Sequence, residues 1–177
     1  MNPYPIPITE SSRIASLLSY RILDTPPDAG FEDIVDAARR LLSVPIALVS
    51  LVDTDRQWFK ARRGCDPSEV SRELAICAHA ILTSEPMVVP DTLRDPRFCD
   101  NPLVVGEPQV RFYLGVPIIT PGGERIGTVC ALDTLPREAR YSDVKIMKFL
   151  ARQTERLLEL HQLRLERLDL LANRPVY

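Results

Sequence analysis

The sequence predicts an α+β fold, in which short strands occupy the middle of the chain and helices lie towards both ends. Between residues 46 and 133, short apolar runs alternate with polar segments rich in turn-forming residues, a pattern typical of strands. Residues 142–172 contain no proline or glycine, which favours one long helix. With 177 residues, 45% of them hydrophobic and 26% charged, the chain is long enough for one domain with a sizeable core.

Two helices are expected before the first strand. Residues 1–9 are rich in proline and are expected to form an extended tail, and a helix is expected to begin near Thr9 or Ser11. Its apolar face would hold Ile14, Leu17 and Leu18. A break at residues 23–27, which contain two prolines, precedes a second helix over Asp28–Ser43 that Pro45 would end. Its apolar residues recur at steps of three and four: Phe31, Ile34, Val35, Ala38, Leu41 and Leu42.

The next residues favour a β-hairpin. Ile46–Val52 is nearly all apolar and predicts a central strand, and residues 53–55 predict a turn. Gln57–Arg63 would be the second strand. Regular alternation along it places Trp58, Lys60 and Arg62 on one face, and Phe59 and Ala61 on the other.

The remaining segments predict short elements and a second hairpin. A polar loop is expected over residues 65–72, a short helix over 75–82 and a short strand over 87–89. Residues 91–108 form a long connection with three further prolines, and such a connection inside a compact domain is usually functional or disordered. Strands over residues 112–120 and 125–132 would be joined by the turn at Pro121, Gly122 and Gly123.

The last helix is expected to run from Ser142, as N-cap, to about Ala172, with Asp143 in its first turn. One apolar seam would hold Met147, Leu150, Thr154, Leu157, His161, Leu168 and Leu171, interrupted by Arg164. A neighbouring seam would hold Ala151, Leu158, Leu165 and Ala172. Two overlapping seams predict a helix whose first part packs on its own domain and whose later part packs on a partner helix, which would give a homodimer.

Polar side chains in the loops above the predicted sheet suggest a pocket for a small ligand. The residues that we predict contact this ligand are Cys77, His79, Asp91, Asp95, Phe98, Asn101, Arg111, Tyr113 and Asp133. Structural roles are the alternatives: His79 could bond a loop carbonyl, and Asp91 and Asp95 could form caps and turns. Arg94, Arg97 and Arg111 could hold an anion, or they could pair with neighbouring aspartates.

Several classes of function are disfavoured by composition. The net charge is −2, so no basic surplus favours a nucleic-acid partner. No apolar run is long enough for a membrane span and no secretory signal is recognisable, so a cytoplasmic location is the default expectation. The four cysteines form no CxxC pair and the two histidines are far apart, so no metal site is expected. No cofactor can be identified from the sequence.

Several ordered motifs resemble the GAF domain of bacterial signalling proteins. They are ICAHAI at residue 76, VVPDTLRDPRF at 88, VRFYLGVPI at 110 and GGERIGTVCALD at 122, together with residues 20–64. The closest similarity is to the subtype associated with sensor histidine kinases, as in two-component systems, and with diguanylate cyclases. The resemblance implies a central antiparallel sheet, with the N- and C-terminal helices packed on one face and pocket loops on the other. It also implies a tail and helix over 1–19, a GAF domain over 20–160, and the end of a signalling helix over 161–177.

What the resemblance implies for function is a sensor module without catalytic activity, which binds a small molecule and signals to an output kinase or cyclase domain. The motif of cyclic-nucleotide binders is missing. The order Cys77-Ala78-His79 also differs from the adjacent cysteine and histidine of bilin-binding members.

Two alternatives remain open. Some GAF proteins are free methionine-R-sulfoxide reductases, and Cys77, Cys99 and Cys65 would then be the reactive thiols. The chain could instead be a dimerisation module with a vestigial pocket, filled by its own Tyr113 or Phe112.

Overall fold

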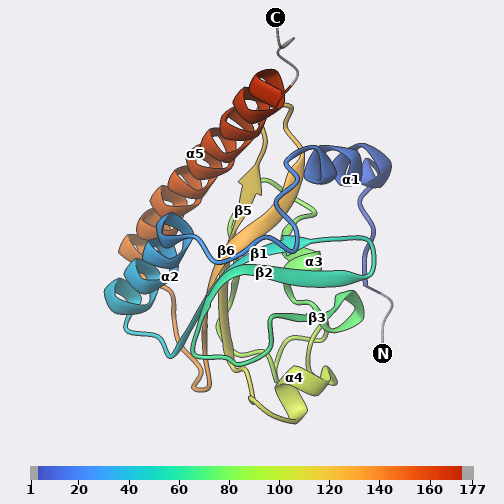
Figure 1. Ribbon diagram of the computed structural model, residues 1–177. Helices are drawn as coiled ribbons and strands as arrows, with labels where there is room; N and C mark the ends of the chain where they lie inside the picture. Colours follow the sequence, from blue (N-terminus) through green and yellow to red (C-terminus); the bar gives the residue numbers. More distant parts are fainter. Residues whose placement is uncertain (1–3, 173–177) are drawn as a thin grey trace, which may run out of the picture.

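The computed structural model describes residues 4–172 and contains one six-stranded antiparallel sheet. The strand order is β3-β2-β1-β6-β5-β4, which confirms the expected α+β class. Helices α2 and α5 cover one face, whereas α3, α4 and their loops cover the other (Figure 1). The strands are β1 (Ile46–Val52), β2 (Arg56–Arg63), β3 (Glu69–Ser71), β4 (Met87–Val89), β5 (Phe112–Ile119) and β6 (Arg125–Asp133). The helices are α1 (Glu10–Ser19), α2 (Ala29–Leu42), the 3-10 turn η1 (Arg72–Leu74), α3 (Cys77–Ala80), α4 (Pro102–Val105) and α5 (Tyr141–Ala172).

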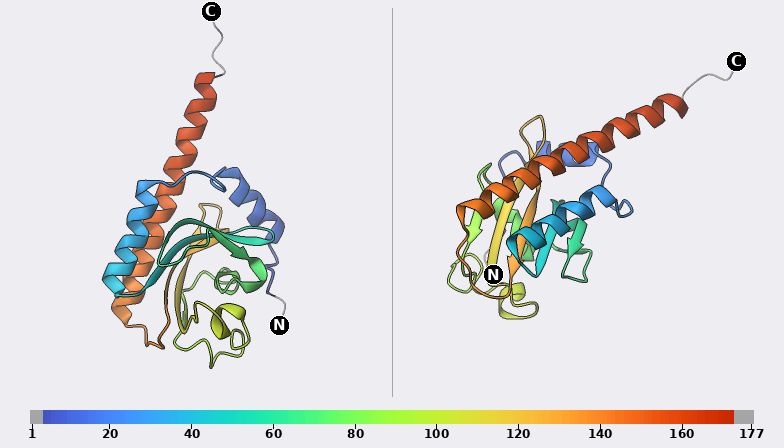
Figure 2. Two further views of the ribbon diagram at one scale, coloured as in Figure 1. Left: turned by 60° about the horizontal axis from the view of Figure 1, so that its bottom comes forward. Right: turned by 90° about the vertical axis from the view of Figure 1, so that its left-hand side faces the viewer.

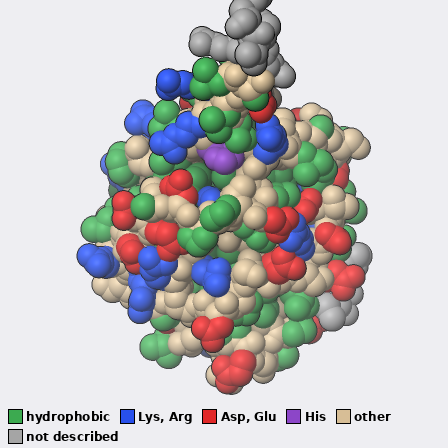
Figure 3. Space-filling model, viewed as in Figure 1, with side chains coloured by type: hydrophobic (Ala, Val, Ile, Leu, Met, Phe, Trp, Pro, Cys, Tyr) green, Lys and Arg blue, Asp and Glu red, His purple; other side chains and the backbone are tan. Residues whose placement is uncertain are grey.

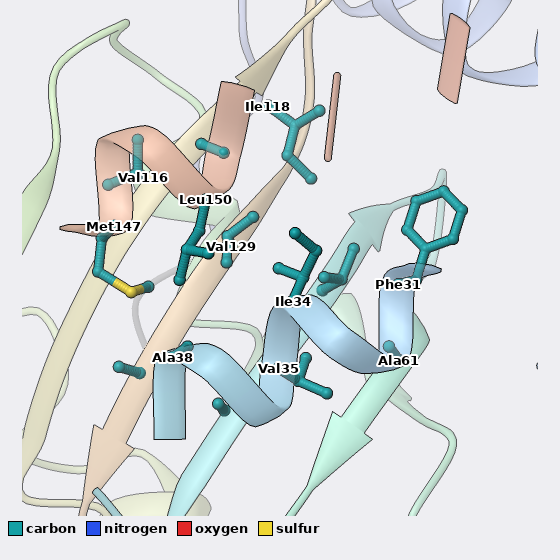
Figure 4. Close-up of a cluster of buried hydrophobic side chains, with 14 of the residues drawn as sticks. Phe31, Ile34, Val35, Ala38, Ala61, Val116, Ile118, Val129, Met147 and Leu150 are labelled. Carbon is teal, nitrogen blue, oxygen red and sulfur yellow. The ribbon is translucent and has the colours of Figure 1, made fainter. Parts of the chain in front are cut away.

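The main core lies between the sheet and the two helices α2 and α5 (Figure 4). The predicted apolar stripe of α2 faces this core except for Leu41, which is exposed and was predicted wrongly. Asp28 caps the N-terminus of α2 by accepting a hydrogen bond from Gly30 N. The helix ends before Pro45, because Ser43 adopts the left-handed conformation, with φ 52°.

Helix α1 lies at the end of the sheet, beside the β5–β6 hairpin (Figure 1). Leu17 is buried as expected, but Leu18 is 54% exposed, contrary to the prediction. The charged residue Arg13 is buried instead, and its Nη1 donates to the carbonyl of Val52 at the end of β1. Residues 13 and 17 are one helical turn apart, so the face of α1 that packs on the sheet combines a charged arginine with a leucine.

A β-bulge in β2 overturns the predicted alternation of its side chains. Val49 pairs with Ala61 and Ser50 pairs with Phe59, so Lys60 is the extra residue. Ala61 therefore lies in the helix-side core, while Phe59 faces the opposite side of the sheet. The expected grouping of Phe59 with Ala61 was wrong, because the bulge shifts the alternation by one residue.

Helix α5 is 32 residues long and begins at Tyr141, two residues before the start expected from Ser142 as N-cap. Ser142 is therefore not the N-cap; instead Asp143 accepts a hydrogen bond from Arg140 N at 3.0 Å. The first half of α5 packs on the sheet through Met147, Leu150, Ala151, Thr154 and Leu158. Its second half projects beyond the sheet (Figure 2), so the first part of the two-stage prediction for this helix is confirmed.

Two segments predicted as loops contain short elements. Residues 65–72 include β3, which extends the sheet beside β2. The connection over 91–108 contains α4, capped by Asn101, whose Oδ1 accepts from Leu103 N at 2.9 Å. Proline at the first helical position of α4 is compatible with this cap, because the first turn needs no donor there.

Candidate functional site

A cavity of about 380 Å³ opens on the face of the sheet opposite α2 and α5. Its floor is formed by β1, β2 and β6, and its walls come from the segment after β2 and from the α4 region. The lining residues are Ile46, Leu48, Phe59, Gly64, Cys65, Asp66, Pro67, Val70, Leu103, Glu107, Pro108, Val110 and Leu132. The walls are mostly apolar, as in typical small-molecule sites.

The cavity continues inward into a smaller space of about 50 Å³. The two spaces share six lining residues: Leu48, Phe59, Val70, Leu103, Val110 and Leu132. The inner space adds Gln57, Ala75, Ile76, Cys77, Tyr113 and Cys130. The site is therefore an apolar channel whose inner end is lined by two cysteines.

Hydroxyl groups surround the sulfur of Cys77 at this inner end. Tyr113 Oη donates to Cys77 Sγ at 3.2 Å, and Thr128 Oγ1 donates to it at 3.1 Å. Ser50 Oγ lies 3.0 Å from Thr128 Oγ1, and Cys130 Sγ lies 3.8 Å from Cys77 Sγ. All five residues are buried, so these contacts satisfy the polar atoms without solvent.

The two neighbouring thiols have opposite pKa shifts. Burial alone would raise the pKa of Cys77, but the hydrogen bonds that Cys77 receives outweigh burial and hold its pKa below the usual range. Burial and the neighbouring Cys77 sulfur together raise the pKa of Cys130. Of the two sulfurs, Cys77 is therefore the one that carries thiolate character.

Gln57 places an unpaired acceptor at the inner space. The side chain is only 4% exposed, and its Oε1 has no hydrogen-bond partner among residues 4–172. A buried carbonyl oxygen without a donor costs free energy, and most such groups in folded proteins are paired. A bound molecule with an N–H or O–H group would satisfy this oxygen.

Tyr113 reaches Cys77 across a glycine on β5. A Cβ atom added to Gly115 would lie 2.1 Å from Tyr113 Oη, so only glycine leaves room for the phenol ring on this face of the strand. The ring fills part of the inner space but leaves the outer cavity open. Phe112, which was the other expected filling residue, lies in the core on the opposite face.

Acidic side chains flank the mouth of the cavity, where Asp66 and Glu107 are among the lining residues. Arg111 lies nearby on the α4 side, but its Nη1 donates to the carbonyl oxygens of Val104 and Val110. The guanidinium therefore holds the wall of the cavity in place.

The predicted ligand contacts separate into three groups in the structure. Cys77 and Tyr113 line the inner space, whereas Asp91 and Asp95 line a larger, open groove of about 630 Å³ beside β4. The aspartates of this groove already pair with arginines: Asp91 with Arg94 and Asp95 with Arg97. Groups paired in this way are less available to a ligand, so the cavity over the sheet is the better candidate site.

The remaining predicted residues hold the loops together. Asn101 Nδ2 donates to Leu74 O at 3.0 Å, and Asp133 pairs with Arg137 at 2.9 Å. His79 packs edge-to-face on Phe98, with ring centroids 4.8 Å apart, and burial lowers the pKa of His79. A ligand contact by any of these residues stays a prediction.

Sequence reasoning missed most of the apolar lining, and Gln57 with it. Nearly every residue of β1 is apolar, so its two faces cannot be told apart by alternation. The sequence predicted Gln57 only as the first residue of a strand. A glutamine next to Trp58 in a largely buried strand is nevertheless a signal for a buried polar contact.

Charged side chains of both signs are interspersed over the face shown in Figure 3, with no extended patch of one sign. Within residues 4–172, no three His, Cys, Asp or Glu side chains come together in a metal-binding arrangement. No helix in the described part of the chain has the length and apolar composition needed to cross a membrane.

An antiparallel sheet with two helices on one face, and short helices over a cavity on the other, defines an α+β domain of the GAF type. The GAF domain family model matches residues 26–158. The chain therefore belongs to the GAF family, which confirms the resemblance noted in the sequence.

The chain is similar in sequence to one phosphodiesterase and in fold to several solved structures. The chain is 40% identical over 161 residues to cyclic di-GMP phosphodiesterase PA2567 of Pseudomonas aeruginosa; the match covers 90% of this chain but 27% of that protein. The blue-light-absorbing PixJ GAF domain of Thermosynechococcus elongatus superposes with a TM-score of 0.66 at 19% identity, covering 83% of this chain and 94% of that one. Free methionine-R-sulfoxide reductase of Neisseria meningitidis superposes with a TM-score of 0.64 at 16% identity, covering 93% and 99%. At these identities the two structures show a shared fold, and the chain spans about a quarter of the curated relative.

Proposed function

We propose that this chain is a non-catalytic sensor domain that binds a small molecule in the cavity over β1, β2 and β6. The observation that carries the proposal is an apolar cavity over the sheet whose inner end is lined by Gln57, a residue with an unpaired side-chain oxygen. A ligand donor in the inner space would satisfy this acceptor when the Gln57 side chain turns toward it.

The lining favours a particular ligand chemistry. The walls suit a largely apolar molecule, and Gln57 suits a hydrogen-bond donor at its inner end. Asp66 and Glu107 at the mouth suit a second donor or a positive charge at the outer end. Of the ligand contacts predicted from the sequence, we propose Cys77 and Tyr113.

Strand β5 offers a direct route from the cavity to α5. It begins beside the inner space, with Tyr113, and ends at Ile119, whose N–H donates to Glu155 Oε1 of α5 at 2.9 Å. The β5–β6 register shifts between Ile118 and Ile119, at the point where the helix holds the strand. A ligand that favours one position of β5 would thereby favour one position of α5, since only differential affinity moves such an equilibrium.

We propose that α5 carries this signal to a second copy of the chain and to an output domain. The output would be a kinase, a cyclase or, as the name of the Pseudomonas relative suggests, a phosphodiesterase. The protein would act in the cytoplasm as part of a bacterial signalling pathway. Its GAF domain would extend over residues 20–160, as the sequence predicts.

The dimer is testable on the exposed half of α5. Leu157 is unsuitable for this test, because Gly30 of α2 lies directly against it. Leu168 and Leu171 lie in the predicted seam and are 60% and 48% exposed, so Leu168→Glu with Leu171→Glu should yield monomers without loss of folding. Light scattering measures the mass, and Leu163→Glu with Leu170→Glu, outside both predicted seams, is the control for added charge. An unchanged dimer in the seam variant would contradict the proposal.

The reductase alternative has less support from the geometry. The sulfur next to Cys77 is that of Cys130, whereas Cys99 is exposed and Cys65 lines the outer cavity. This alternative requires Cys99 to approach Cys77, but Cys99 is exposed whereas Cys77 is buried.

Retention of a ligand from cell extract tests the proposal. The purified chain is mixed with the small-molecule fraction of its source cells, separated by gel filtration and denatured, and the released molecules are weighed. Leu103→Trp fills the outer cavity and should abolish retention, whereas the surface control Leu163→Trp should retain the same molecule. Equal retention by both variants, or none by the unmodified chain, would contradict the proposed site.

A further inference from the structure

We propose that Cys77 and Cys130 form a redox site, in which a small hydroperoxide entering the cavity converts the two thiols into a disulfide. This inference goes beyond ligand sensing and does not depend on the identity of the ligand. Three structural observations support it: the distance between the sulfurs, the donors around Cys77 and the position of both residues at the inner space.

The sulfurs are already neighbours. Cys77 Sγ and Cys130 Sγ are 3.8 Å apart, and a disulfide requires about 2.05 Å. Cys130 lies on β6, which is paired on both sides by β1 and β5. Cys77 lies on α3, which is only four residues long and is followed by loop, so a small shift of α3 can close the distance.

The surroundings activate one sulfur and keep the other protonated. Two hydroxyl donors, Tyr113 Oη and Thr128 Oγ1, point at Cys77 Sγ and stabilise negative charge on it. The lowered pKa of Cys77 and the raised pKa of Cys130 agree with this geometry. A thiolate next to a thiol is the arrangement that disulfide formation uses.

Access is limited to small molecules. Cys77 is 1% exposed and Cys130 is fully buried, but both line the inner space that opens into the outer cavity. The inner space of about 50 Å³ can admit hydrogen peroxide and excludes bulky reagents.

The chemistry balances with the hydroperoxide as the only oxidant. The Cys77 thiolate attacks one peroxide oxygen, the O–O bond breaks, and Cys77 sulfenic acid and an alkoxide or hydroxide form; the released anion takes up a proton from solvent. The sulfur of Cys130 then attacks the sulfenic sulfur, the S–O bond breaks, and the Cys130 proton leaves with the hydroxyl group as water. The two sulfurs lose two electrons in total, and the peroxide gains them.

Disulfide formation would alter the ligand site. When Cys77 moves toward Cys130, its contacts with Tyr113 and Thr128 weaken, and the inner end of the cavity loses a thiol that can accept hydrogen bonds. The redox state of the pair would therefore change which molecules the inner space accepts.

The test treats the whole chain with hydrogen peroxide and maps the cysteine-containing peptides by mass spectrometry without reduction. The Cys65→Ser, Cys99→Ser double variant keeps only the buried pair, and it should lose two hydrogen atoms of mass and yield a Cys77–Cys130 peptide that dithiothreitol separates. In the Cys130→Ser variant the crosslink should be lost and Cys77 should gain one oxygen atom. Leu103→Trp should slow the reaction of the buried pair without slowing the oxidation of exposed Cys99.

Two results would overturn the proposal. One is that the buried pair stays reduced at peroxide concentrations that fully oxidise Cys99 in the unmodified chain. The other is that Cys77 crosslinks to Cys65 or Cys99 in the unmodified chain. Circular dichroism of each variant before treatment shows whether it is folded, and the unmodified chain supplies the result if a variant is not.

Discussion

Replacing Glu10 with glutamine should destabilise the fold more than most single substitutions. Its carboxylate accepts from Arg13 at 2.7 and 2.8 Å and from Arg72 at 2.5 Å. The two arginines are 1% and 2% exposed; Arg72 reaches Glu10 through Nη1, and its Nε and Nη2 have no hydrogen-bond partner within the described chain. Glu10 is thus the carboxylate that both buried guanidinium groups share, and it ties α1 to the segment after β3.

The magnitude follows from the geometry and from the shifted pKa. Burial alone would raise the pKa of Glu10, but the hydrogen bonds from Arg13 and Arg72 outweigh it and lower the pKa to about 2. The ordinary value is about 4.3, and one pKa unit corresponds to about 1.4 kcal/mol, so the charged form contributes up to about 3 kcal/mol, an upper limit because solvent screens a carboxylate that is 21% exposed. Removing one partner of a buried ion pair costs a similar amount, about 3–5 kcal/mol.

Urea unfolding at pH 7 measures this cost directly, and Glu10→Gln should lower the free energy of unfolding by about 3 kcal/mol. The control Asp169→Asn disrupts the exposed pair with Arg21 and should cost less than about 1 kcal/mol. Because the pKa of Glu10 is lowered in the folded state, its contribution is present above the unfolded pKa and disappears as the pH falls through about 2. A loss below 1 kcal/mol at pH 7, or a difference between Glu10→Gln and the unmodified chain that is the same at pH 7 and pH 2.5, would refute the reasoning.

Two further predictions concern the cavity floor and its link to α5. Gly115→Ala would place a methyl group 2.1 Å from Tyr113 Oη and should lower the free energy of unfolding, measured in urea, by about 1–3 kcal/mol. The control Gly122→Ala, with 3.7 Å to its nearest neighbour, should lower it less. Equal losses would contradict the packing described. Glu155→Gln keeps an acceptor for Ile119 N but removes the charge. Burial raises the pKa of Glu155, so the folded state favours the protonated form. The pKa of this side chain in the unfolded chain is about 4.3. As the pH rises from that value through the raised folded pKa, the unmodified chain should therefore lose stability relative to Glu155→Gln. A stability difference that is independent of pH from 4 to 8 would contradict this.

The sequence predicted the order and type of the main elements well, because their patterns are strong and local. The stripe of α2 and the apolar run of β1 match the expected positions, and Asp28 caps α2 as the helix boundary required. The bulge at Lys60 could not be predicted, because it depends on pairing with β1 and on the contacts of its ammonium group with Thr25 and Pro26.

The candidate site was predicted only in outline. The connection over residues 91–108 does form one wall of the cavity, and Cys77 and Tyr113 do meet at its inner end. The proximity of Cys77 to Cys130 arises because α3 packs against β6, a tertiary contact between segments 53 residues apart. Local pattern does not carry such information, and the unpaired oxygen of Gln57 is visible only once its neighbours are in place.

The central claim is that occupancy of the cavity is passed to α5. Hydrogen exchange followed by mass spectrometry tests it most directly, by comparing the chain loaded with the molecule recovered from extract with the same preparation after that molecule is removed. Occupancy should slow exchange in the cavity wall over residues 103–110 and also change exchange in α5 beyond Leu158, where the helix leaves the sheet. Protection confined to the cavity wall, with α5 unchanged, would contradict the account.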